Sequence, residues 1–169
     1  DIDLTHPLLG VQRIVPIPGG DILLIGQEIR RFKPNGTLDP TFGGGDGIMP
    51  VPQSLVDTNQ YLENAAVLPD GRVIAIVAPR HDTLLFNADG SAHSGGFMAY
   101  DPSFTGGVYV GCGDVDPTNP GDEIITGPGA GGGPHVKVFS RDGDLRGQFM
   151  AYDAKFTGGI RVAGAGTNV

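Results

Sequence analysis

The feature that most constrains the fold of this chain is an internal repeat of about fifty residues. The segment FMAYD at residues 97–101 is followed by FTGG at 104–107, and both return 52 residues later, at 149–153 and 156–159. Self-similarity at this period is typical of repeat architectures, in which each unit buries its apolar surface against its neighbours. The chain is therefore expected to be an array of small, similar units.

A fainter copy of the repeat runs through the N-terminal half. Residues 14–25 match residues 65–76 at an offset of 51, and each segment has the pattern strand, tight turn, strand. Pro18-Gly19-Gly20 and Pro69-Asp70-Gly71 supply turn residues between runs of apolar and β-branched side chains. These segments predict one hairpin in each copy.

A second hairpin signal recurs in all three copies. Asn35-Gly36, Asp89-Gly90 and Asp142-Gly143 each follow a strand-like run that contains a phenylalanine, and they lie 54 and 53 residues apart. Asn-Gly and Asp-Gly favour the tight turns that join antiparallel strands. Each unit is thus predicted to contain four strands, which is the size of a β-propeller blade.

We therefore predict an all-β fold, a β-propeller-like array of four-stranded antiparallel blades. Residues 1–169 are expected to form one repeat domain, with blades at about 11–60, 61–107 and 108–159 and a partial fourth blade at 160–169. Three blades are fewer than the roughly four to eight of known propellers. More chain or associating copies would complete a larger ring or assembly, or the sheets stack openly, and the sequence does not choose among these.

Composition agrees with many short strands, since the chain has 29 glycines and 14 prolines. The net charge is −8 and the basic residues are scattered, so no basic stripe exists and no nucleic-acid partner is expected. No apolar run approaches the roughly 18 residues of a membrane helix, and no membrane span is expected. The acidic excess suits a soluble surface or cation binding.

One loop, residues 113–125, carries oxygen-bearing side chains at regular spacing. Calcium binds about six to eight oxygen ligands, and carboxylates on alternate residues of a tight loop can point to one centre. The candidate metal ligands are Asp114, Asp116, Thr118, Pro120 through its carbonyl, and Asp122. An acidic turn whose aspartates cap backbone amides explains the same spacing. The spacing alone leaves both interpretations open.

The C-terminal part resembles the FG-GAP/VCBS-type calcium repeat of integrin-like bacterial propellers. The resemblance covers about residues 97–169 and rests on Gly-Asp-Val-Asp…Gly-Asp-Glu-Ile-Ile-Thr-Gly at 113–127 and on the segments around it. It implies a propeller with Ca²⁺ in the acidic loop. Thr118 stands where the family usually has Asp or Asn, and Asn119 where it has Gly, which implies weaker calcium binding. The following repeat, at 164–168, has no acidic loop, so one calcium site at most is expected.

The N-terminal part, about residues 11–95, resembles a different group, the delta-60 type repeats of secreted bacterial proteins. Residues 31–48 carry this resemblance, with Arg-Phe followed by Asn-Gly-Thr-Leu-Asp-Pro-Thr-Phe and a glycine run. Members of that group are also predicted propellers. Together the two resemblances imply an extracellular or cell-surface bacterial location.

Several other features have structural explanations. The glycine run 127–133 lacks the Gly-Lys-Ser/Thr of a phosphate-binding loop and precedes a strand, so we interpret it as a tight inter-strand crossing. Cys112 lies in an apolar strand and is expected to be unreactive. Tyr100 and Tyr152 recur with Phe97 and Phe149 and are expected in the inter-blade core.

The four histidines lack the spacing of a metal site and are expected to be polar turn residues. They are His6, His81, His93 and His135. The serines lack a nucleophile motif, so no catalytic triad is expected.

The sequence thus predicts a non-catalytic structural or interaction module whose rim loops meet a protein or glycan partner. Two alternatives stay open. A carbohydrate-active propeller enzyme would need converging carboxylates, whereas the repetition of Asp101 and Asp153 favours a turn role. A subunit of a surface fibre or lattice would self-associate through free sheet edges.

Overall fold

The computed structural model describes residues 13–17, 19–50, 61–78, 81–93 and 96–164. Across these ranges the chain forms strands, turns and loops without a helix, which confirms the all-β prediction. The described part accordingly holds no helix long and apolar enough to cross a membrane.

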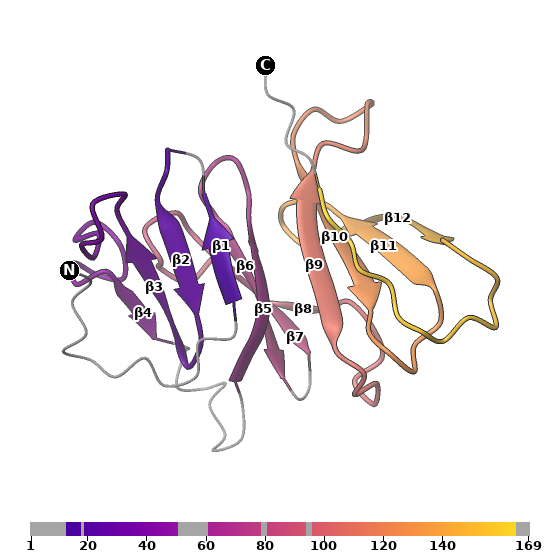
Figure 1. Ribbon diagram of the computed structural model, residues 1–169. Helices are drawn as coiled ribbons and strands as arrows, with labels where there is room; N and C mark the ends of the chain where they lie inside the picture. Colours follow the sequence, from indigo (N-terminus) through magenta and orange to yellow (C-terminus); the bar gives the residue numbers. More distant parts are fainter. Residues whose placement is uncertain (1–12, 18, 51–60, 79–80, 94–95, 165–169) are drawn as a thin grey trace.

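Three antiparallel sheets of four strands follow one another along the chain (Figure 1). The first contains β1 (Arg13–Pro16), β2 (Ile22–Ile25), β3 (Glu28–Phe32) and β4 (Ile48–Pro50). The second contains β5 (Tyr61–Val67), β6 (Val73–Ala78), β7 (Asp82–Phe86) and β8 (Phe97–Met98). The third contains β9 (Val108–Gly113), β10 (Glu123–Pro128), β11 (His135–Phe139) and β12 (Leu145–Met150).

Each sheet is a meander, since strands that are neighbours in sequence are neighbours in the sheet. One sheet falls within each of the ranges 11–60, 61–107 and 108–159. Residues 160–164 run on without a strand, and the remaining residues of the expected fourth blade, 165–169, lie outside the described residues.

The Asn-Gly and Asp-Gly pairs form the turns predicted for them. Gly36, Gly90 and Gly143 have φ values of 83°, 83° and 97°. Residues with a Cβ atom rarely adopt this left-handed backbone conformation, whereas glycine adopts it without steric cost. The turns between the first two strands of the first and second sheets are tight as well, with Gly20 and Gly71 at φ values of 90° and 87°. Pro18, expected in the first of them, lies outside the described residues.

The first strand of each sheet lies near the first strand of the next. β1 and β2 contact β5, and β5 and β6 contact β9. The second sheet therefore stands between the first and the third, as the magenta strands of Figure 1 do between the indigo and the orange ones.

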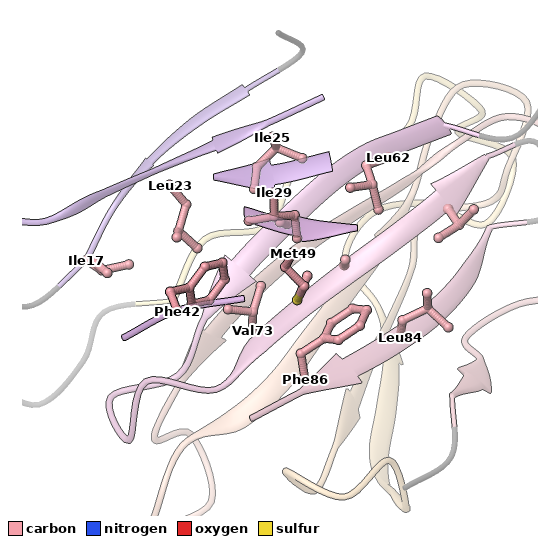
Figure 2. Close-up of a cluster of buried hydrophobic side chains, with 13 residues drawn as sticks. Ile17, Leu23, Ile25, Ile29, Phe42, Met49, Leu62, Val73, Leu84 and Phe86 are labelled. Atoms are coloured by element: carbon pink, nitrogen blue, oxygen red, sulfur yellow. The ribbon is translucent and has the colours of Figure 1, made fainter. Parts of the chain in front are cut away.

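An apolar cluster fills the space between the first and second sheets (Figure 2). Leu23, Ile25 and Ile29 of the first sheet pack there with Leu62 and Val73 of the second, all of them nearly inaccessible to solvent. Full burial of each aliphatic side chain of this size stabilises the fold by about 1.5–3 kcal/mol. A second cluster joins the second and third sheets in the same manner.

Each sheet turns the same face towards the sheet that follows it. In β2, Leu23 and Ile25 face the second sheet, and in β6, Ile74 and Ile76 face the third. Ile125 of β10 occupies the corresponding position and packs beneath the chain segment that follows the third sheet. Because strand side chains alternate between faces, β6 is buried on both sides, which explains its uninterrupted apolar sequence.

Candidate functional site

The acidic loop after β9 is organised by hydrogen bonds within the loop. Asp116 Oδ1 accepts bonds from the Thr118 amide at 3.0 Å and from the Thr118 hydroxyl at 2.6 Å. These bonds stabilise the carboxylate and hold the pKa of Asp116 below its usual value. Two of the five candidate ligands, Asp116 and Thr118, are thus brought together and bond to each other.

Glu123 holds the loop closed and was missed by the sequence analysis. Its side chain is 2% exposed, and Oε2 accepts hydrogen bonds from the amides of Val115 and Asp116 at 3.0 and 3.1 Å. Charge-assisted bonds of this kind are roughly twice as strong as neutral ones. The only signal in the sequence was an acid at the start of the apolar strand β10.

The remaining acids of the loop repel one another. Burial raises the pKa of Asp122, and the charges of Asp114 and Glu123 raise it further, although Arg141 opposes them. A cation between Asp114 and Asp122 would relieve this repulsion. In the part of the chain that the structure describes, however, no three His, Cys, Asp or Glu side chains converge on one point. Pro120 is exposed, and calcium binding at this loop stays a prediction.

Cys112, beside this loop, packs against the apolar cluster between the second and third sheets. Burial raises the pKa of its thiol to about 12, with smaller contributions from the charges of Asp122 and Asp70. The thiolate is the nucleophilic form, and a pKa this high disfavours it at neutral pH.

The described histidines have different surroundings. The prediction of a polar turn residue is wrong for His135, which is the first residue of strand β11. His81 lies in a turn, but it is 6% exposed and has a left-handed backbone with φ of 57°. Its Nδ1 lies 2.9 Å from Glu63 Oε2, and its Nε2 accepts a bond from the Gly107 amide at 3.3 Å. His93 bonds Asn87, and His6 lies outside the described residues.

In the first sheet, the Asp-Pro-Thr-Phe motif anchors a long turn. Asp39 is 1% exposed and forms ion pairs with Arg31 at 3.1 Å and Lys33 at 3.0 Å. Burial alone would raise the pKa of Asp39, but the hydrogen bonds from Thr41 and Lys33 outweigh it and lower the pKa to about 2. The motif thus has a structural use.

The first copy of the repeated segment, residues 97–107, joins the second sheet to the third. The Phe97 and Phe139 rings lie 4.5 Å apart. The Tyr100 hydroxyl lies 2.7 Å from the His135 carbonyl oxygen and 3.0 Å from that of Thr126. These contacts confirm that Phe97 and Tyr100 belong to the inter-sheet core.

Lys137 of β11 completes this junction. Its ammonium group donates a hydrogen bond to the Ala99 carbonyl at 2.8 Å and lies 5.0 Å from the centre of the Tyr100 ring. An ammonium group over an aromatic face is attracted by the electron density of the ring. Lys137 and Phe139 therefore form a receiving surface on the third sheet for the segment 97–101.

The glycine run after β10 is a close crossing of two chain segments, as interpreted from the sequence. The Gly129 amide donates to the Gly107 carbonyl at 2.8 Å. A Cβ atom on Gly129 would lie 1.8 Å from the Gly106 oxygen, and one on Gly106 would lie 2.2 Å from the Ala130 oxygen. Only glycine allows the two backbones to approach this closely.

The second copy of the segment lies on the far side of the third sheet and is exposed. Phe149 is 56% exposed, Met150 54%, Tyr152 63% and Phe156 42%. The prediction that Phe149 and Tyr152 lie in an inter-blade core is therefore wrong for the described residues, because no sheet covers them.

The aspartate of each copy starts the same local turn. Asp101 Oδ1 accepts a hydrogen bond from the Ser103 amide at 2.8 Å, and Asp153 Oδ1 accepts one from the Lys155 amide at 2.9 Å. The turn role that the repetition of Asp101 and Asp153 favoured is confirmed.

Comparison with known proteins shows the fold alone. The chain is similar to a solved protein of unknown function from Bacteroides caccae, with a TM-score of 0.50 and 13% sequence identity. The match covers 85% of this chain and 46% of the other, so the chain spans less than half the length of that protein. No protein-family model matches the chain, and no curated protein sequence matches it significantly. The resemblances to FG-GAP and delta-60 repeats stay predictions.

Proposed function

We propose that the chain is a run of β-propeller blades and serves as a non-catalytic structural or interaction module of a secreted or cell-surface bacterial protein. The observation that carries this proposal is the shared arrangement of the three sheets. Each is a four-stranded meander that presents the same face to its successor, and the first strands β1, β5 and β9 lie next to one another. Propellers are built by repeating this relation around an axis.

The use of the polar residues at the junction of the second and third sheets supports a structural role. Tyr100 and Lys137 bond backbone carbonyls across the second junction, and His81 holds the backbone at Gly107. Asp101 organises its own turn. These are the groups that a catalytic site would need for proton transfer, and here they hold backbone in place.

Partners would bind the loops at the ends of the sheets, where side chains are not buried between the sheets. Residues 117–120 of the acidic loop and Arg141 and Asp142 of the neighbouring turn are exposed. A protein or a glycan is the expected partner class.

The non-catalytic role is tested by incubating the purified chain with a panel of extracellular polysaccharides. New reducing ends and unsaturated products are measured, and binding is followed by glycan array on the same preparation. We expect no product above a heat-denatured control. A product whose formation is lost in Asp114→Ala would overturn the proposal in favour of a carbohydrate-active enzyme.

The calcium part of the proposal has its own test. A ligand that binds only the folded state raises the melting temperature, so a chelator should lower it by a few degrees and added Ca²⁺ should restore it. Asp114→Asn together with Asp122→Asn should abolish the difference, whereas Asp46→Asn, in a turn of the first sheet, should preserve it. Identical melting with and without chelator rules calcium out.

A further inference from the structure

The side chains of Phe149, Tyr152 and Phe156 are exposed, and we call this group the terminal aromatic surface. Single exposed apolar residues are common, but a group of large aromatic ones on one short segment marks a place where another molecule or segment binds. A binding partner for this surface can be inferred from the rest of the chain.

The first copy of the repeated segment has the same aromatic residues, and there the third sheet covers them. Phe97, Tyr100 and Phe104 have the same order and spacing as the three of the terminal aromatic surface. Phe97 and Tyr100 pack into the apolar cluster between the second and third sheets, and the Phe104 ring lies against the glycine run at Gly132. The Phe97 ring packs against the Phe139 ring. The Tyr100 hydroxyl lies within hydrogen-bond distance of the carbonyl oxygens of His135 in β11 and Thr126 in β10.

The terminal aromatic surface has the local shape of its covered counterpart. The amide of Phe104 bonds the Asp101 carbonyl at 2.9 Å, and that of Phe156 bonds the Asp153 carbonyl at 2.8 Å. The Tyr152 and Phe156 rings lie 5.2 Å apart at 58°, and the Tyr100 and Phe104 rings lie 6.2 Å apart at 64°. The surface is thus organised without a partner, which lowers the entropic cost of binding one.

The segment that follows this surface, residues 160–164, corresponds in the repeat to the start of strand β9. Ile160 and Val162 lie 52 residues after Val108 and Val110, which begin β9. Ile160 and Val162 pack on Ile125, and the Ile160 amide bonds the Pro128 carbonyl at 2.8 Å.

Glycines on the third sheet make room for this segment. A Cβ atom on Gly127 would lie 2.4 Å from the Ile160 oxygen, and one on Gly111 would lie 3.1 Å from the Ala163 Cα. The outer face of the third sheet is therefore shaped for the close approach of the chain segment 160–164.

We propose that the terminal aromatic surface docks a fourth four-stranded sheet of the same repeat, placed directly after the third. That sheet would offer a lysine and an aromatic residue at the positions of Lys137 and Phe139, and a glycine run at the position of 127–133. The inference rests on the proposed propeller arrangement and adds the partner that extends it.

The test inserts a second copy of residues 108–159 after Gly159 of the full chain and measures hydroxyl-radical labelling. In the inserted copy, Gln148→Glu gives its FMAYD peptide a distinct mass. We expect labelling of the original 149–153 to fall several-fold, to the level of 97–101. In the extended chain, Phe149→Ala in the original copy should lower the melting temperature, although it leaves the unextended chain unchanged.

A matched control tests the chemistry of the docking surface. An inserted copy with Phe139→Ala and Lys137→Met should restore fast labelling of the original 149–153. If the original 149–153 is labelled as fast in the extended chain as in the unextended chain, the inference is overturned. If 97–101 is still protected in that experiment, the proposed function stands. Equal labelling of 97–101 and 149–153 in the unextended chain overturns the proposed function itself. Protection that rises with the concentration of the unextended chain identifies a second copy as the occupant and also overturns the inference.

Discussion

Residues 97–107 and 149–159 have nearly the same sequence and different surroundings. In the first copy, Ala99 is 1% exposed and the Tyr100 hydroxyl lies within hydrogen-bond distance of two carbonyl groups of the neighbouring sheet. In the second copy, Ala151 is exposed and Tyr152 is 63% exposed. Local conformation follows the sequence in both copies, but burial depends on whether a sheet follows. In a repeat protein, the stability of each unit therefore depends on its neighbour.

The close crossing at Gly129 offers the strongest way to break the covered junction. Gly129→Ala places a Cβ atom against the Gly106 oxygen, and separating the two backbones should cost about 3 kcal/mol of unfolding free energy. Gly133→Ala is the control, since a Cβ atom there meets nothing within 4 Å. Urea unfolding measures both, and equal losses would show that the crossing is not tight.

The phenylalanines of the two copies sharpen the comparison directly. Phe97→Ala removes a half-buried ring that packs on Phe139 and should lower the unfolding free energy by about 2 kcal/mol. Phe149→Ala removes an exposed ring and should change it by less than about 0.5 kcal/mol. Thermal and urea unfolding check both variants, and similar losses at the two sites contradict the account.

The tyrosines differ in their response to alkaline pH. Burial raises the pKa of Tyr100 to about 12, from an ordinary value of 10. A folded-state pKa above the unfolded value means that Tyr100 contributes stability below pH 10, which is lost as the pH rises towards 12. Tyr100→Phe should cost about 1 kcal/mol at pH 8 and should weaken the alkaline loss.

Tyr152→Phe is the control for this titration. It should leave both the stability at pH 8 and the alkaline loss unchanged, and the contribution of Cys112 is the same in all the variants. An alkaline profile that Tyr100→Phe does not alter would show that the Tyr100 hydroxyl is not held at the junction.

The smallest expected effect is at Lys137. Lys137→Met keeps the apolar stem but loses the bond to the Ala99 carbonyl and the contact with the Tyr100 ring. The unfolding free energy should fall by about 0.5–1 kcal/mol. Lys155→Met replaces an exposed lysine in the second copy and should have no measurable effect.

Much of the fold was predictable because its determinants are local. The turns at Gly36, Gly90 and Gly143 need a left-handed glycine, and a dipeptide of the sequence marks each of them. The glycine run was correctly interpreted as a crossing, since a residue without a side chain has few other uses beside a strand.

The parts that escaped prediction depend on contacts that no local pattern marks. The buried Glu123 bonds amides at the opposite end of its own loop, and the buried His81 bonds the Gly107 amide, 26 residues away. The acidic loop was ambiguous for a related reason. Alternating oxygen ligands suit both a cation and the amides of the loop, and Asp116 and Glu123 bond the amides.

The central claim is that two identical segments differ in burial, since 97–101 packs against the third sheet and 149–153 is exposed. Hydroxyl-radical labelling of the purified chain tests it most directly, because the two FMAYD peptides have the same intrinsic reactivity and their flanking residues distinguish them by mass. The account predicts that 149–153 is labelled several-fold faster than 97–101. Equal labelling of the two peptides would contradict it.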